Sequence, residues 1–216
     1  MSTEPEQSEA DRMASLMQAV GNQYFMLQSA RGGTIAESSS RSSLYLTSLT
    51  GAVVGLSFVA QASGLGQTFF VFALAILPVV FFLGVVTYYR TMQTGIEDVI
   101  YARAMGRIQA FYSGIDPAHA SLFHESSIDQ VGLARLGLFK LRWQQFLSSA
   151  AVVAIVNSVV GGVFVALVVA DATRVAAVVA IGVGAAAALL IGLVFLRHQW
   201  TTWMRVATAL PMDASG

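Results

Sequence analysis

The chain has 216 residues, of which 56% are hydrophobic and only 11% are charged, and its mean hydropathy is +0.67. Soluble globular domains carry about 25% charged residues, so the composition argues against a soluble single domain. The 12 basic and 12 acidic residues cancel, which removes the basic surface expected of a nucleic-acid-binding protein, and the absence of cysteine excludes disulfides, thiolate catalysis and cysteine-ligated metals.

The fold class follows from three long gaps between charged residues. A charge at the centre of a bilayer costs roughly 2.5 to 3.5 kcal/mol, so membrane spans are nearly free of charges. Between Arg41 and Arg90 lie 48 uncharged residues, which is room for two spans of about 20 residues each and a turn at Gln61–Gln67. Two further gaps, 143–170 and 175–196, each hold one span. We predict an all-α membrane protein with four transmembrane helices, arranged as two hairpins, at about 44–62, 68–89, 147–169 and 175–196.

The basic residues predict the orientation of these spans. All of them except Arg174 lie in the N-terminal tail, the central connection or the C-terminal tail, which would share one side of the membrane. The positive-inside rule therefore places both termini in the cytoplasm. The first twelve residues are acidic and precede no apolar run, so we expect no cleaved signal peptide. The composition, rich in Ala, Gly and Val with Lys140 as its one lysine, is typical of a GC-rich bacterial genome, and we expect a multi-pass protein of the cell inner membrane.

We expect the chain to consist of five segments. They are a cytoplasmic tail with an amphipathic helix (1–43), a first transmembrane hairpin (44–89), a cytoplasmic helical insert (90–146), a second transmembrane hairpin (147–196) and a cytoplasmic tail (197–216).

The N-terminal segment carries an apolar stripe at helical spacing. Its members are Met13, Leu16, Met17, Val20, Tyr24 and Leu27. We expect this helix to end near Gly32-Gly33, and Glu37 and Arg41 to pair at the i, i+4 spacing just before the first span. The stripe fits a helix packed on its own neighbours, and alternatively a docking or oligomer surface.

The central insert is predicted to be a helical hairpin. The pattern after the second span continues past Arg90 to about Phe111, and Ser113–Pro117 has the composition of a turn. A short segment at Ala118–Glu125 and a second helix at about Asp129–Gln145 would then lead to the third span. This insert is too small to be an enzyme domain by itself.

The spans contain small residues at helical spacing, which let helix backbones approach closely. The candidates for helix packing or for lining a pore are Gly51, Gly55, Ser158, Gly162, Gly184, Ala188 and Gly192. Packing within one chain and packing between protomers are both open. Asn157, the one amide near the middle of a span, fits interhelical hydrogen bonding or a position facing a pore, and Pro78 predicts a local kink.

The sequence carries no catalytic, cofactor or metal signature. His119 and His124 are spaced by five residues, which does not place both rings on one helical face, and the glycine pairs lack the context of a phosphate-binding loop. No ionisable residue lies inside the four predicted spans, which argues against a proton pump or an ion-coupled transporter. We therefore expect that the protein is not an enzyme and binds no cofactor.

The run Tyr24–Arg31, with Ala36-Glu37 and Arg41–Leu44, resembles a group of uncharacterised actinobacterial integral membrane proteins. In layout, residues 20 to 110 are also similar to the membrane effectors of nucleotide-signalled anti-phage defence, the SLATT and Pycsar transmembrane families, although the second hairpin departs from that layout. The resemblance implies an oligomer that permeabilises the inner membrane when a cytoplasmic signal, such as a cyclic nucleotide, arrives.

Three functional hypotheses follow. The first is an oligomeric, signal-responsive effector or pore in the lipid bilayer, acting in antiviral defence if the resemblance holds. The second is a scaffold or accessory subunit that recruits a cytoplasmic protein through residues 1–43 and 91–142. The third is a small-molecule transporter, which the scarcity of polar groups within the spans disfavours.

Overall fold

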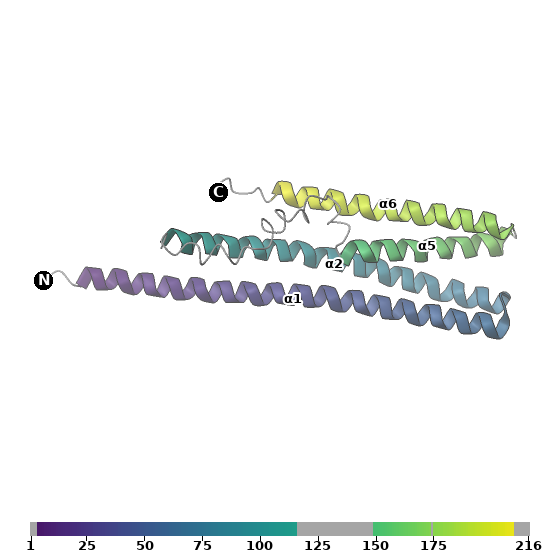
Figure 1. Ribbon diagram of the computed structural model, residues 1–216, viewed down its shortest axis with the longest axis horizontal. Helices are drawn as coiled ribbons and strands as arrows, with labels where there is room; N and C mark the ends of the chain where they lie inside the picture. Colours follow the sequence, from purple (N-terminus) through teal and green to yellow (C-terminus); the bar gives the residue numbers. More distant parts are fainter. Residues whose placement is uncertain (1–3, 116–148, 174, 210–216) are drawn as a thin grey trace, which may run out of the picture. The chain divides into compact units, whose positions relative to one another are not determined.

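All regular secondary structure in the described part of the chain is helical. The computed structural model describes residues 4–115, 149–173 and 175–209, and these contain no strand (Figure 1). The helices are α1 (Glu4–Ser63), α2 (Gln67–Ile115), α5 (Ser149–Thr173) and α6 (Ala177–Ala209). Each of the four has the length and composition needed to cross a membrane, which confirms the all-α class and the number of candidate spans. The expected segments at 118–125 and 129–145 lie outside the described residues.

Helix α1 is continuous through Gly32-Gly33, so the expected helix end at this pair is wrong. A glycine in a helix interior costs about 1 kcal/mol relative to alanine, which weakens a helix but leaves its hydrogen bonds intact. Many helices end at a residue that adopts a left-handed conformation. Gly64, with φ of 63°, has that conformation directly after Ser63, and the short connection Gly64–Gly66 leads into α2.

Helix α2 also extends well beyond its apolar part. It runs without a break past Arg90 to Ile115, which confirms the expected continuation of the helix after the second span. Pro78 lies in its interior, and α2 remains a single helix through this position.

The chain divides into two compact units, and α1 and α2 supply residues to both. The first unit comprises residues 1–36 and 94–142, and the second comprises 37–93 and 143–216. In the second unit, buried residues of all four helices form one apolar core. It includes Tyr45 and Ala52 of α1, Ala73, Leu77, Val80 and Tyr88 of α2, Ala150, Val153, Ala154 and Val160 of α5, and Phe195 of α6.

The outer faces of the second unit carry large apolar side chains. Val178 is 80% exposed and Leu189 is 70% exposed, and both belong to α6. Soluble monomers rarely expose extended apolar surfaces, whereas a helix in a bilayer presents such side chains to lipid. The arrangement therefore fits a multi-pass membrane protein.

In the first unit, the stripe of the N-terminal helix faces the C-terminal part of α2. The Tyr112 hydroxyl donates a hydrogen bond of 3.1 Å to the carbonyl oxygen of Met17, and the Gln109 amide donates one of 3.2 Å to the Tyr24 hydroxyl. Nε of Arg31 lies 2.8 Å from Oδ1 of Asp98 in a half-buried ion pair. Contacts within the chain therefore use part of this stripe.

Candidate functional site: buried polar junctions between apolar helices

Asn157 lies at a junction of three helices in the second unit. Both Asn157 on α5 and Tyr45 on α1 are fully buried. The Tyr45 hydroxyl donates a hydrogen bond of 3.2 Å to Oδ1 of Asn157. Residues 112 positions apart in the chain are thus joined by a polar contact inside a mostly apolar core.

Gly84 on α2 provides the space for this contact. A Cβ atom at position 84 would overlap Oδ1 and Cγ of Asn157 and would lie 2.8 Å from Cε2 of Tyr45. The missing side chain lets the Asn157 amide and the Tyr45 ring pack directly against the backbone of α2. These three residues, Tyr45, Gly84 and Asn157, form what we call the Asn157 junction.

The hydrogen-bonding capacity of the Asn157 junction is only partly used. Nδ2 of Asn157 is buried, and no group among the described residues accepts a hydrogen bond from it. Leaving a buried polar group unpaired costs about 1 to 3 kcal/mol, and such groups are rare in native proteins. The junction therefore joins α1, α2 and α5 in a packing that leaves one amide donor unsatisfied.

A second polar junction links α2 to α6. The Tyr88 hydroxyl is buried, donates a hydrogen bond of 2.9 Å to the carbonyl oxygen of Phe195, and lies 3.3 Å from Nδ1 of His198. The rings of Tyr88 and Phe195 pack with centroids 4.6 Å apart, and the Tyr89 ring contacts His198 edge to face. Because the hydroxyl bonds a main-chain carbonyl, this contact fixes the position of Tyr88 along α6.

The small residues of α5 and α6 pack against one another within the chain. A Cβ atom at Gly184 would lie 2.6 Å from the carbonyl oxygen of Gly162 and 2.6 Å from Cβ of Ala166. A Cβ atom at Gly162 would similarly meet Ala188 at 2.6 Å, and one at Gly192 would contact Ser158 at 3.5 Å. The close approach of these two helices thus uses most of the small residues that the sequence singled out.

The two glycines of α1 have different surroundings from those of α5 and α6. A Cβ atom at Gly51 would meet nothing within 4 Å, and one at Gly55 would make only an ordinary contact of 3.8 Å with Phe72. The structure thus places Asn157, Ser158, Gly162, Gly184, Ala188 and Gly192 among packed helices, and Gly51 on an open face. Pro78 is half-buried on α2.

The sequence pattern did not indicate Tyr45, Gly84 or Tyr88 as members of these junctions. A signal for the tyrosines was present, because a phenol inside an apolar segment needs a hydrogen-bond partner. Gly84 carried no such signal, since its role depends on a residue of α5 that the sequence does not place beside it.

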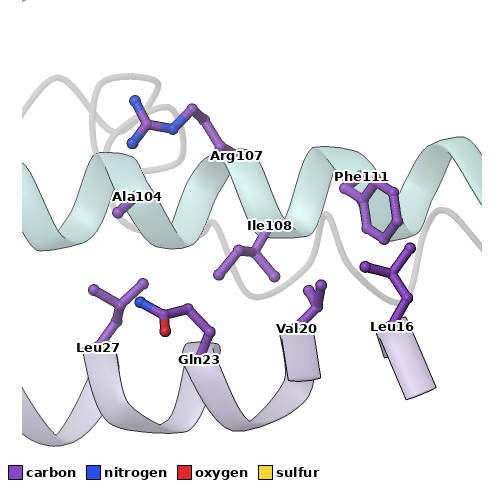
Figure 2. Close-up of a pocket in the computed structure, with 8 residues that line it drawn as sticks. All are labelled: Leu16, Val20, Gln23, Leu27, Ala104, Arg107, Ile108 and Phe111. Carbon is purple, nitrogen blue, oxygen red and sulfur yellow. The ribbon is translucent and has the colours of Figure 1, made fainter. Parts of the chain in front are cut away.

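The first unit contains an apolar groove between α1 and α2, which we call the arm groove. Its volume is about 350 Å³, and Figure 2 shows apolar side chains from both helices directed toward one another across it. Leu16, Val20 and Leu27 of α1 face Ala104, Ile108 and Phe111 of α2, and Gln23 and Arg107 complete the lining. The groove is open on one side and holds few polar atoms, so it suits an apolar side chain or a helix face rather than a small polar ligand.

The described residues offer no metal site. No group of three or more histidine, aspartate or glutamate side chains gathers in the described ranges, and His198 is engaged with Tyr88 and Tyr89. His119 and His124 lie outside those ranges.

Comparisons with known proteins give no relative. The chain matches no protein-family model, no curated protein and no solved structure.

Proposed function

We propose that the protein is a signal-responsive effector of a bacterial inner membrane. In this proposal, four transmembrane helices form two hairpins with both termini and the central insert in the cytoplasm, and several copies assemble in the bilayer. A cytoplasmic trigger binds the helices outside the membrane, and the transmembrane helices then repack and permeabilise the membrane.

The observation that carries the proposal is the Asn157 junction. A fully apolar contact would hold the spans together without an unsatisfied donor, whereas here Nδ2 of Asn157 is buried and has no acceptor in the part of the chain that the structure describes. A second arrangement of the helices in which Nδ2 of Asn157 donates a hydrogen bond would recover part of the free-energy cost of leaving this donor unpaired. The resting arrangement is therefore one that a modest bias can displace, as a two-state membrane effector requires.

The sharing of α1 and α2 between the two units supports the same proposal. Each is one unbroken helix, and each supplies side chains both to the apolar core and to the first unit. A trigger can act only through different affinities for two states. An element that belongs to both units gives binding in the first unit a physical route to the helices of the second.

Permeation would require assembly or repacking. The described spans pack around buried side chains, and residues 42–89 and 175–196 contain no charged residue that could line an aqueous path. A conducting state would therefore expose backbone groups, hydroxyls, Asn157 or lipid headgroups between copies. This is why the effector is proposed as an oligomer.

The test compares Tyr45→Phe with Gly51→Ala. Tyr45→Phe removes the hydroxyl that holds Oδ1 of Asn157, and interhelical hydrogen bonds in membranes contribute about 0.6 kcal/mol on average, so leakage should rise about threefold. Gly51→Ala adds a methyl group where nothing lies within 4 Å and should leave leakage unchanged. The measurements are membrane depolarisation on overproduction and dye release from liposomes with and without cyclic nucleotides. Wild-type protein that neither depolarises cells nor releases dye would overturn the proposal.

The open arm groove favours a second candidate function, a membrane scaffold that recruits a cytoplasmic protein. Under this alternative, Ile108→Ser would release a co-purifying cytoplasmic protein without changing the growth of cells that overproduce the chain. Under the effector proposal the same variant would alter growth inhibition, because the groove would then be part of the trigger's route.

A further inference from the structure

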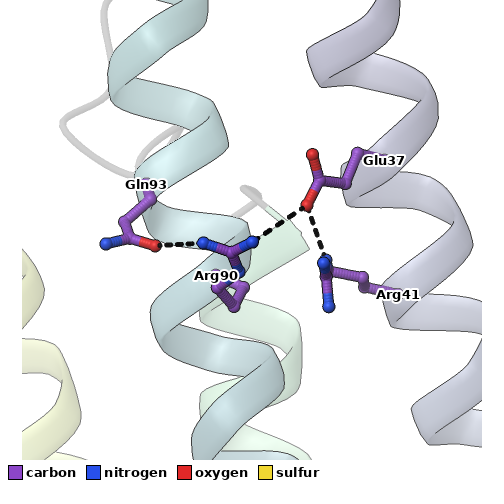
Figure 3. Close-up of polar contacts among 4 residues, drawn as sticks. All are labelled: Glu37, Arg41, Arg90 and Gln93. Atoms are coloured by element: carbon purple, nitrogen blue, oxygen red, sulfur yellow. Dashed lines mark hydrogen bonds and ion pairs between the residues drawn. The ribbon is translucent and has the colours of Figure 1, made fainter.

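A group of charged side chains lies where the apolar segments of α1 and α2 begin and end. Arg41 donates a hydrogen bond of 2.8 Å from Nε to Oε1 of Glu37, and Nη2 of Arg90 lies 3.7 Å from the same oxygen (Figure 3). Nη1 of Arg90 donates to the side-chain oxygen of Gln93 at 3.3 Å. We call Glu37, Arg41, Arg90 and Gln93 the arginine cluster.

The arginine cluster has an excess of positive charge. Two guanidinium groups share one carboxylate oxygen, which leaves a net charge of +1. The contact from Arg90 to Glu37 is longer than a hydrogen bond, and the Arg90 side chain is 52% exposed. Arg90 therefore keeps N–H donors directed to its surroundings, in the planar arrangement that matches a phosphate group.

The arginine cluster lies at the ends of the first two spans, where they are expected to meet the membrane surface. Arg41 and Arg90 are the two charged residues that border the 48 uncharged residues of the first two spans. Gly64 turns the chain at the far end of these spans, so both arginines lie at the same end. Tyr89, beside Arg90, is 46% exposed, and exposed tyrosines are enriched at the level of lipid headgroups.

We propose that Arg41 and Arg90 together bind the phosphate of an anionic phospholipid. The lipid's acyl chains would lie along the apolar faces of α1 and α2, and its phosphate would replace the weak contact of Arg90 with Glu37. A zwitterionic lipid carries its own cation and gains less from the net charge of the site. The inference rests on membrane insertion and is independent of effector activity.

The alternative is that the cluster is only a surface ion-pair network. Exposed ion pairs add little to stability, and their loss is expected to be nearly silent. The two interpretations predict different effects of Glu37→Gln on lipid binding. Glu37→Gln raises the net charge from +1 to +2 and should strengthen lipid binding about fivefold, whereas an ion-pair network would gain nothing from the change.

The experiment measures lipid retained on the purified full-length chain by native mass spectrometry. The probes are dioleoyl phosphatidylglycerol, dioleoyl phosphatidylcholine and inorganic phosphate. We expect the wild type to retain phosphatidylglycerol in preference to phosphatidylcholine, and Arg90→Gln to lower that retention about fivefold. Arg90→Lys should show an intermediate loss, because lysine keeps the charge but not the two-point contact.

Arg197→Gln is the matched control. This variant removes the charge of another exposed arginine, which lies at the end of the fourth span and outside the arginine cluster. Equal losses in Arg197→Gln and Arg90→Gln, or no gain in Glu37→Gln, would overturn the proposal. Displacement of phosphatidylglycerol by millimolar inorganic phosphate would also overturn it, in favour of a site for free phosphate. If Arg90→Gln does not fold, the Glu37→Gln and Arg90→Lys measurements decide the question.

Discussion

Gly84 shows how a single missing side chain can determine a contact between three helices. The Asn157 amide and the Tyr45 ring occupy the volume that any Cβ atom at position 84 would need. Both neighbours are fully buried, so neither can move into open space. The cost of a substitution at Gly84 must therefore be taken up by the backbone of α2 or by loss of the Tyr45 to Asn157 hydrogen bond.

We expect Gly84→Ala to destabilise the protein by about 1 to 3 kcal/mol, the usual cost of overpacking a core. Gly51→Ala, in open surroundings on α1, should be neutral or slightly stabilising because alanine is the better helix former. The measurement is the thermal unfolding midpoint of both variants in the same mild detergent. Equal midpoints for the two variants would mean that the close packing at Gly84 is absent from the folded protein.

At the level of elements, the α5 and α6 pair depends on backbones that approach closely. Lipid surrounds the outer faces of such helices, so the hydrophobic effect does not drive them together, and close van der Waals packing must do so instead. Gly162 and Gly184 face each other at this contact. A Cβ atom at Gly182, two positions away on α6, would meet nothing within 4 Å.

Gly184→Ala and Gly182→Ala therefore form a matched pair on one helix. We expect Gly184→Ala to separate α5 from α6 and to lower the unfolding midpoint in detergent, while Gly182→Ala leaves it unchanged or slightly raised. A Gly184→Ala variant with the wild-type unfolding midpoint would contradict the close packing of these two helices.

For the whole molecule, the main expectation is its orientation in the membrane. With all basic residues except Arg174 on one side, both termini should be cytoplasmic. The chain has no cysteine, so single cysteines can be placed at will. An impermeant thiol reagent applied to intact cells should label Leu65→Cys, which is 73% exposed in the turn, and should not label Ser8→Cys. Labelling of Ser8→Cys in intact cells would reverse the orientation.

The sequence alone determined the all-helical class, the four candidate spans and the passage of α2 beyond Arg90. These features depend on the spacing of charges and of apolar residues along the chain, which is local information. The sequence also predicted the turn at Gln61–Gln67, where α1 ends, but it wrongly predicted a further helix end at Gly32-Gly33. Only the backbone conformation distinguishes them, since Gly64 has a positive φ and α1 continues through the earlier pair.

Only the tertiary structure decided which residues meet. The sequence singled out Asn157 as a polar residue in a span, but its partner Tyr45 and the space provided by Gly84 come from two other helices. The small residues of α5 and α6 were compatible with contacts within one chain and with contacts between copies, and the contact of Gly162 with Gly184 places them inside the chain. Side-chain spacing gives the face of a helix, whereas the choice of partner depends on packing between segments that are distant in sequence.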